Sequence, residues 1–388
     1  MTVMFLVCVA AAAILLAGGF VLRHRLGPAQ TLAATLLTPV ALVGSLLSGV
    51  YLWDGPAIVA AGAGPMGEVL PFFERQMSEW KADTRRADSY SVWVVGDSTH
   101  QSRGNEVLRM TPAIREAALK KGVKGLRIYG VQNANCNAYE FYFLMNRLVE
   151  DPPDLVIMPL NLRAFGSRWI DDSRNGYPVM ERYVPWGRIP EAVRLSARGR
   201  KITTVGVVLR KLDWMLFDSR AQWFLNGLKL RFEGENASES DLSLSLEPIE
   251  SAPRRTREEA VVWLAEFRKI GETTYDQNIR EDHPLIPVFK AIDRLAVEHG
   301  IGVMYYTVQT PDVRAQSISN FTALRWALSR EPGVRYIEML DVVQPEDFER
   351  LEHFYPSGMH RVAGRLVDEI VKARDDAAWR ESVRAGAQ

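Results

Sequence analysis

Short apolar runs alternate with amphipathic stretches over most of the chain beyond residue 90. The apolar runs at 91–96, 125–130, 154–160, 302–308 and 334–337 are typical of strands buried on both faces of a parallel sheet. The stretches around them predict helices over 67–86, 111–122, 139–150, 284–298, 318–329 and 363–373. Strand and helix alternating at this spacing indicate right-handed crossovers. The predicted fold class is therefore α/β, a three-layer α/β/α sandwich with a parallel sheet.

The alternation breaks over residues 165–283, which we interpret as a large, mainly helical insert. Helices are predicted near 190–197, 202–218 and 257–270. The insert also holds five of the ten tryptophans, more apolar surface than a linker would carry. We expect it to fold as a cap over the carboxyl ends of the strands. Core packing and a stacking surface for sugars explain these tryptophans equally well.

The first 53 residues contain two runs without a charged side chain, Val3 to Leu22 and Ala29 to Trp53. Each is long enough to cross the ~30 Å hydrocarbon core as a helix. The basic turn 23–28 between them predicts a hairpin whose turn is cytoplasmic, with the rest of the chain on the extracytoplasmic side. The alternative is a cleaved signal peptide followed by one anchor, but residues 1–4 lack its positive start.

Four regions follow from these patterns. Residues 1–53 are predicted to form the two transmembrane helices, and 54–89 a linker and a lead-in helix. Residues 90–164 and 284–376 form the α/β domain, and 165–283 the cap insert.

Composition narrows the function classes. Lysine plus arginine and aspartate plus glutamate both number 47, so no basic surplus favours nucleic-acid binding. Cys8 lies in an apolar run and Cys136 in a predicted loop, so neither a disulfide framework nor a cysteine metal site is supported. No metal-ligand spacing stands out, and no cofactor is expected.

Three side chains that can carry chemistry follow predicted strands or precede a helix. Ser98 comes just after the strand that ends at Gly96, and Asn161 directly after the strand 154–160. His360 is placed in a Gly- and Pro-bearing loop before the final helix. Since carboxyl ends of parallel strands share one edge, these groups are expected to meet there as nucleophile, oxyanion donor and base. Taken alone, His360 is more often a surface histidine, whereas Asn161 is equally well explained as an ordinary turn residue and as an oxyanion donor; His353 and His100 are rival bases.

These blocks resemble the SGNH (GDSL-type) hydrolase superfamily. Gly96-Asp97-Ser98 matches its nucleophile block, residues 129–134 its oxyanion block, and Asn161 its asparagine block. Ser357-Gly-Met-His360 lies where the family carries Asp-x-x-His. The resemblance implies Ser98, His360 and Asn161 as catalytic residues, with Asn133, Asp97 and Ser357 as oxyanion or binding residues.

Two positions depart from the family pattern. Asn133 stands where the oxyanion glycine is usual, and a backbone donor survives that change. Ser357 replaces the aspartate that would orient His360, which predicts a slower dyad unless a carboxylate such as Asp341 or Asp347 takes its place.

With its predicted anchor, the chain is most similar to DltD-like and alginate-acetylation proteins of this superfamily. That similarity implies an O-acyltransferase or esterase in the bacterial inner membrane, with its catalytic domain in the periplasm. It would act on an exopolysaccharide of the cell envelope, through O-acetylation or its reversal, beside a membrane-bound O-acyltransferase that supplies acyl groups. Two alternatives stay open: a non-catalytic binding or assembly subunit, and a lipid-directed esterase.

Overall fold

The computed structural model describes the α/β body and parts of the insert. The described residues are 66–83, 89–97, 99, 109–132, 136–166, 170, 178–197, 202–217, 223–224, 228, 256–260, 262–263, 279–307, 315–328, 331–350 and 353–387. The two apolar runs before residue 54 lie outside them, so the transmembrane hairpin remains a prediction. Among the helices within the described ranges, none is long and apolar enough to cross a bilayer.

Five parallel strands form the central sheet. They are β1 (Tyr90–Gly96), β2 (Leu126–Gln132), β3 (Leu155–Leu160), β4 (Gly302–Thr307) and β5 (Val334–Ile337), in the order β2-β1-β3-β4-β5. All four pairings are parallel. The α/β class and the parallel sheet predicted from the sequence are thus confirmed.

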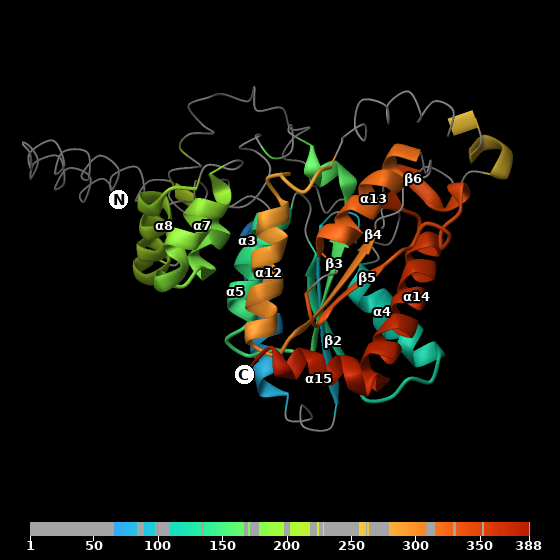
Figure 1. Cartoon of the computed structure of the whole chain (residues 1–388), viewed down its shortest axis with the longest axis horizontal. Coiled ribbons are helices and arrows are strands. Elements are labelled where there is room, and N and C mark those ends of the chain that lie inside the picture. The colour runs from blue at the N-terminus through green and yellow to red at the C-terminus, as the bar shows by residue number, and fades with distance from the viewer. Residues whose placement is uncertain are drawn as a thin grey trace, which may run out of the picture. The chain divides into compact units, whose positions relative to one another are not determined.

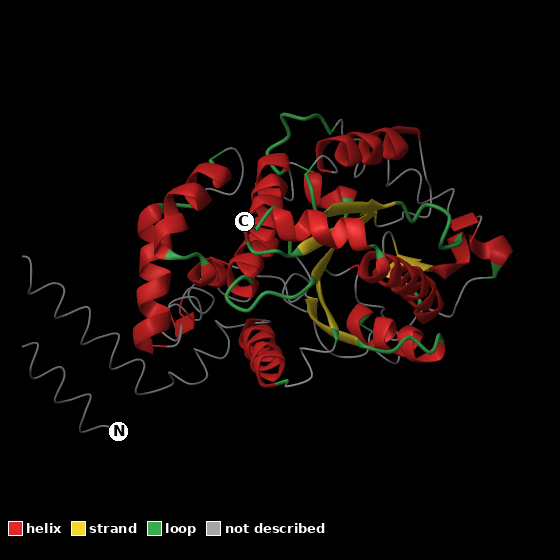
Figure 2. Cartoon of the chain, turned by 60° about the horizontal axis from the view of Figure 1, so that its bottom comes forward, coloured by secondary structure: helices red, strands yellow, loops and turns green. Residues whose placement is uncertain are grey.

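Helices cover both faces of the sheet (Figures 1 and 2). One face carries α4 (Met110–Lys120) and α14 (Pro356–Asp375); the other carries α3 (Met66–Ala82), α5 (Ala138–Leu148) and α12 (Ile286–Glu298). Towards α4 and α14, Val94 packs in one apolar cluster with Ile114 and Leu366. On the opposite face, Trp93 stacks on Tyr129. Alternate residues of β1 therefore enter two separate cores, which is why the strand is apolar throughout.

The chain divides into two compact units, 1–67 with 213–243, and 68–212 with 244–388. The second unit holds the sheet, and α3 belongs to it through Trp80, which meets Trp93 edge to face. After β3, η3 (Leu162–Phe165) leads into the insert, where the structure describes η4 (Pro178–Tyr183), η5 (Trp186–Arg188), α7 (Ile189–Ser196) and α8 (Thr204–Phe217). Helices at α7 and α8 were expected from the sequence. The predicted helix 257–270 is described as helical only at 257–260 and 262–263.

The final helix begins earlier than predicted. It starts at Pro356 rather than near residue 363, so His360 lies inside the helix and not in a loop. Pro356 occupies the first helical turn, where its missing N–H costs nothing. Gly358 lies against Asp347, whose carbonyl oxygen would be 3.0 Å from an added Cβ atom, so close packing explains this glycine. Before the helix, η6 (Pro345–Asp347) leads into a hairpin of β6 (Phe348–Arg350) and β7 (His353–Phe354), which the sequence did not predict.

A carboxyl group is buried between α12 and β4. Asp293 is fully buried, and its Oδ1 accepts a hydrogen bond of 2.7 Å from the Tyr305 hydroxyl. Its Oδ2 has no hydrogen-bond partner within the part of the chain that is described. Burial raises the pKa of Asp293 well above its ordinary value, and the Tyr305 hydrogen bond only partly opposes this. Asp293 is therefore neutral over a wider pH range than an exposed aspartate.

The Asp293→Asn variant should be more stable than the native protein at alkaline pH and equal to it near pH 4. With a raised folded-state pKa, the stabilisation by Asp293 is complete below its unfolded-state pKa and is lost as pH rises towards the folded-state value. Each unit of pKa difference corresponds to about 1.4 kcal/mol. Thermal unfolding at pH 5 and pH 8 measures this, with the exposed Asp282→Asn as control. Parallel pH dependence of Asp293→Asn and native protein would contradict it.

Candidate functional site

The strand order places a topological switch point between β1 and β3. The chain leaves β1 for β2 on one side, then returns across β1 to build β3, β4 and β5 on the other. In sheets of this order, ligands bind outside the carboxyl ends of the two strands at the switch. Asp97 follows β1 directly and Asn161 follows β3 directly. The Asn161 side chain donates from Nδ2 to Asp97 Oδ2 at 3.2 Å, so two predicted site residues meet at this edge.

Asp97 also fixes the turn that follows β1. Its Oδ1 accepts from the backbone N–H of Thr99 at 2.9 Å and from the Thr99 hydroxyl. Asp97, Thr99 and Asn161 are 5%, 1% and 8% exposed, so this is a buried polar cluster and not a surface contact. Sequence reasoning missed Thr99, although an Asp two residues before a Thr is a known signal for such a side-chain-to-backbone turn.

Asp97 also affects the titration of Tyr306 in β4. It is 1% exposed, and its burial raises the pKa of the phenol well above the ordinary value. The negative charge of Asp97 raises that pKa further. Tyr306 therefore stays protonated and is a neutral neighbour of the cluster rather than a base.

The carboxyl end of β2 lies next to β1, on the side of β1 that faces away from β3. Gln132 donates from Nε2 to the carbonyl of Val94 at 2.8 Å and to the Thr111 hydroxyl at 2.7 Å. An added Cβ at Gly130 would lie 2.3 Å from the Val94 carbonyl oxygen, so only glycine fits here. This glycine of the predicted oxyanion block has a packing role. Asn133, the predicted backbone donor, lies outside the described residues.

His360 faces α4. Its Nδ1 is 3.8 Å from Glu116 Oε2, and the two side chains are 39% and 44% exposed. Lys121 of the same helix donates to the Gly364 carbonyl one turn further along α14, which sets these two helices side by side. The structure thus gives His360 a carboxylate partner that the sequence did not suggest. Ser98 lies outside the described residues.

In the contacts described, Ser357 does not take the role of the aspartate that orients the histidine in the SGNH superfamily. Its hydroxyl donates to Asp347 Oδ1 at 2.7 Å. Asp347 is completely buried, and its Oδ2 accepts from the Gln344 N–H and lies 3.2 Å from Arg361 Nε. Ser357 and Asp347 therefore connect the start of α14 to the loop before it, a structural role.

In the part of the chain that the structure describes, neither His283 nor His353 is a better base. His283 Nε2 is 2.9 Å from the Phe165 carbonyl, and its Nδ1 accepts from the Leu285 N–H at 3.3 Å. Burial lowers the pKa of His283, so it is a neutral structural residue. His353 is buried in β7 and not at a helix end as expected. His24 and His100 lie outside the described ranges.

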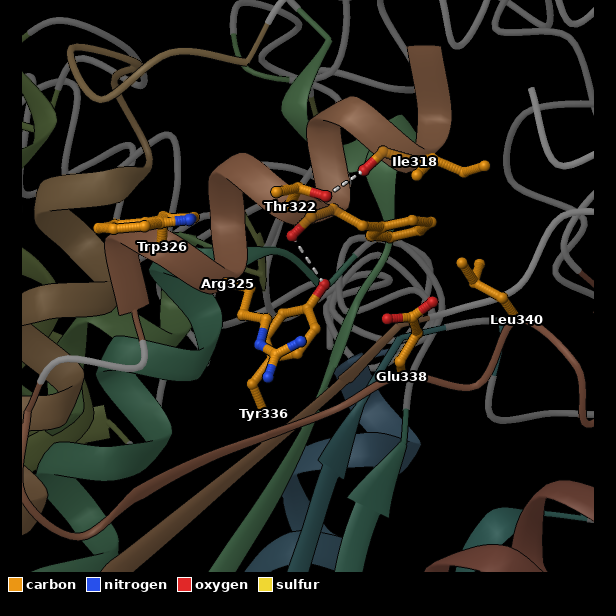
Figure 3. Close-up of a pocket in the computed structure, with 8 residues that line it drawn as sticks. Ile318, Thr322, Arg325, Trp326, Tyr336, Glu338 and Leu340 are labelled. Carbon is orange, nitrogen blue, oxygen red and sulfur yellow. Dashed lines mark hydrogen bonds between the residues drawn. The ribbon is translucent and has the colours of Figure 1, made fainter. Parts of the chain in front are cut away.

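A cavity of about 400 Å³ lies beside the edge strand β5, between it and α13 (Ala315–Leu328) (Figure 3). The Tyr336 hydroxyl of β5 crosses it to donate to the Phe321 carbonyl at 3.1 Å. Trp326, 61% exposed, forms part of its wall together with Arg325 and Glu338. Two strands separate β5 from β1, roughly 14 Å between strand axes, so this cavity is distinct from the switch-point cluster.

Within the described part of the chain, no three His, Cys, Asp or Glu side chains form a group that could hold a metal ion. Cys136 is buried. No protein-family model matches the chain, and no curated protein matches it either.

Proposed function

We propose that the chain is an SGNH-type serine enzyme that transfers an acyl group, preferentially acetyl, to or from a cell-envelope polysaccharide. The observation that carries this proposal is the Asp97–Asn161 hydrogen bond at the switch point. Asp97 immediately precedes Ser98 in the sequence, and Asn161 is the residue that the resemblance assigns to the oxyanion. The fold supports the proposal because this edge is where such sheets bind their ligands.

In the proposed reaction, the Ser98 hydroxyl attacks the carbonyl carbon of an acyl ester while His360 accepts the hydroxyl proton. Asn161 and backbone N–H groups stabilise the tetrahedral oxyanion. A carboxamide nitrogen carries two hydrogens, so donation to Asp97 orients the Asn161 group without using its full capacity. Collapse expels the alcohol, which takes the proton from His360. The acyl group then passes from Ser98 to a sugar hydroxyl in transfer, or to water in hydrolysis.

Glu116 is proposed to replace the missing family aspartate. It faces Nδ1 of His360, the nitrogen that a triad carboxylate contacts, and leaves Nε2 for proton transfer. Its distance of 3.8 Å and its exposure make it a weaker partner than a buried aspartate. Glu116 acts here as a positioning residue.

Two parts of the proposal, the polysaccharide substrate and the extracytoplasmic location, are based on the two charge-free runs before residue 54 and on the resemblance. A membrane-bound O-acyltransferase is the proposed acyl source. The exposed indole of Trp326, beside Arg325 and Glu338, supports a sugar polymer, since flat aromatic surfaces with polar neighbours suit sugar rings.

A second candidate function is a non-catalytic subunit that binds a glycan or assembles with the acyltransferase. The engagement of Ser357 with buried Asp347 favours it, because the position that carries the family aspartate has been given a structural role.

Ester cleavage separates the two functions. The purified, detergent-solubilised full chain is incubated with p-nitrophenyl acetate, and peptides are then searched by mass spectrometry for an acetyl group on Ser98. Turnover with acetyl-Ser98 supports the enzyme. Absence of both, from a protein that gives a cooperative unfolding transition, supports the binding subunit.

Removal of the Glu116 carboxylate should slow ester cleavage only through His360. Because the pair is exposed and screened by solvent, we expect Glu116→Gln to lower kcat only about 3-fold, and His360→Gln to lower it about 10²–10⁴-fold. In the His360→Gln background, Glu116→Gln should have no further effect. Lys120→Gln, which removes the other ionic partner of Glu116, is the control. Additive losses in the double variant would disprove the coupling.

A further inference from the structure

Helix α8 (Thr204–Phe217) places two basic side chains against the body of the protein and aliphatic side chains in solvent. On its inner side, Lys211 is 6% exposed and donates from Nζ to the carbonyls of Arg182 at 2.9 Å and Val184 at 2.7 Å. Arg210 forms an ion pair of 2.6 Å with the buried carboxylate of Glu181. These contacts fix the rotation of α8, because turning it would break three charge-assisted hydrogen bonds.

The outer side of α8 is aliphatic. Val205, Leu209 and Leu212 are 68%, 60% and 41% exposed, and further along the helix Met215 and Leu216 are 65% and 68% exposed. Positions 205, 209, 212 and 216 follow the three- and four-residue spacing of one helical stripe. The 14-residue helix is about 21 Å long, so the stripe is a continuous apolar surface and not a set of scattered exposed side chains.

Basic residues surround this stripe in the sequence. Between Glu191 and Asp213 the chain has no acidic residue and six basic ones, namely Arg194, Arg198, Arg200, Lys201, Arg210 and Lys211. Trp186, 51% exposed, lies beneath the Lys211 ammonium, which is 5.1 Å from the ring centroid. An apolar stripe with basic residues and an exposed tryptophan is the pattern of a helix that lies in the interface of an anionic bilayer.

We propose that α8 lies on an anionic lipid surface, with Val205, Leu209 and Leu212 in the acyl-chain boundary. The two charge-free runs of this chain supply the reason to choose lipid over a partner protein, since a chain held at a bilayer meets lipid at high effective concentration. Arg210 and Lys211 are held on the inner side of α8, so the four basic residues within 194–201 are the ones proposed to meet anionic headgroups. The proposal rests on the predicted anchor of the proposed function but not on the acyl-transfer reaction; its consequence is that the insert, and not only the predicted anchor, contacts the membrane.

The test uses full-length protein with Cys8→Ser and one new cysteine that carries an environment-sensitive NBD fluorophore. Leu209→Cys reports on the stripe, and Leu119→Cys, 78% exposed on α4, is the matched control. The native Cys136 is buried, and protein without an added cysteine gives the background labelling. Each protein is reconstituted in vesicles of phosphatidylglycerol and phosphatidylcholine in equal parts, or of phosphatidylcholine alone, with and without doxyl-labelled lipid.

At position 209 we expect a blue-shifted emission and loss of most of the fluorescence to the doxyl lipid in phosphatidylglycerol vesicles, with a smaller loss in phosphatidylcholine alone. Position 119 should show neither effect. Introducing Leu212→Asp should remove both the blue shift and the doxyl quenching at position 209 without altering thermal unfolding. Equal behaviour of positions 209 and 119, or quenching that does not depend on phosphatidylglycerol, would overturn the proposal. So would a blue shift in native membranes that is absent from these vesicles, which would indicate a protein partner.

Discussion

Replacing Ser98 with alanine is expected to abolish the cleavage of p-nitrophenyl acetate and to remove the acetyl group from the peptide that contains residue 98. Removing the nucleophile of a serine enzyme costs on the order of 10⁴-fold or more in kcat, because the remaining oxyanion donors stabilise only the uncatalysed attack by water. Initial rates and mass spectrometry of the trapped intermediate measure the two effects independently.

The matched control for this variant is Ser78→Ala. Ser78 lies on α3, and its exposed hydroxyl donates to the Glu74 carbonyl one turn earlier, so the same atom is removed far from the switch point. Its rate should equal that of the native protein. Retained turnover in Ser98→Ala, with the acetyl group found on another residue, would refute the assignment of Ser98 and leave the fold unaffected.

Strands β1, β3 and β4 could be predicted from the sequence because every residue in them is buried. The β5 bounds agree with the predicted 334–337, and β1 ends at Gly96 as expected. An uninterrupted apolar run is a strong signal of this kind of strand. The β6–β7 hairpin has no such signal: its strands have three and two residues, and Glu349 and Arg350 interrupt the apolar positions. Strands this short are defined by tertiary contacts.

The candidate site could be predicted only where strand ends determine it. Asp97 and Asn161 meet because both follow strands that are neighbours in the sheet. His360 belongs to a helix, and which way a helical side chain faces depends on the rotation of that helix against its neighbour. The Pro and Gly before His360 indicated a loop, yet Pro356 begins α14 and Gly358 allows it to approach Asp347. The Glu116 contact follows from the packing of α14 on α4, which local sequence does not encode.

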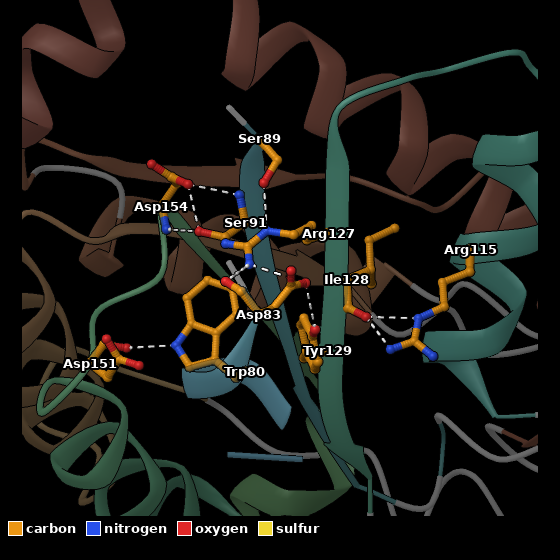
Figure 4. A network of polar contacts seen from close by, with 10 residues as sticks. All are labelled: Trp80, Asp83, Ser89, Ser91, Arg115, Arg127, Ile128, Tyr129, Asp151 and Asp154. Carbon is orange, nitrogen blue, oxygen red and sulfur yellow. Dashed lines mark hydrogen bonds and ion pairs between the residues drawn. The ribbon is translucent and has the colours of Figure 1, made fainter. Parts of the chain in front are cut away.

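The amino ends of the strands, opposite the candidate site, hold a buried polar network that joins α3 to the sheet (Figure 4). Arg127 of β2 and Asp83, just after α3, are 6% and 7% exposed and lie 3.2 Å apart. The Arg127 guanidinium is 4.4 Å from the Trp80 ring centroid, and Tyr129 donates to Asp83 at 3.1 Å. Removing one charge of a buried pair leaves the other without compensation in a site that excludes water.

Arg127→Met should therefore lower the free energy of unfolding by about 3–5 kcal/mol, one of the largest single-residue effects in this chain. Asp83→Leu in that background should recover much of the loss, because it removes the stranded carboxylate, whereas Asp83→Leu alone should destabilise by a similar amount. Denaturant unfolding of the four proteins measures the coupling. Arg365→Met, which removes an exposed partner of Glu369 and leaves Glu369 paired with Lys372, should cost less than about 1 kcal/mol and serves as the control. A loss in Arg127→Met no greater than in Arg365→Met would show that α3 is held by its apolar contacts, chiefly those of Phe73 and Trp80 with Trp93, and not by the charged pair.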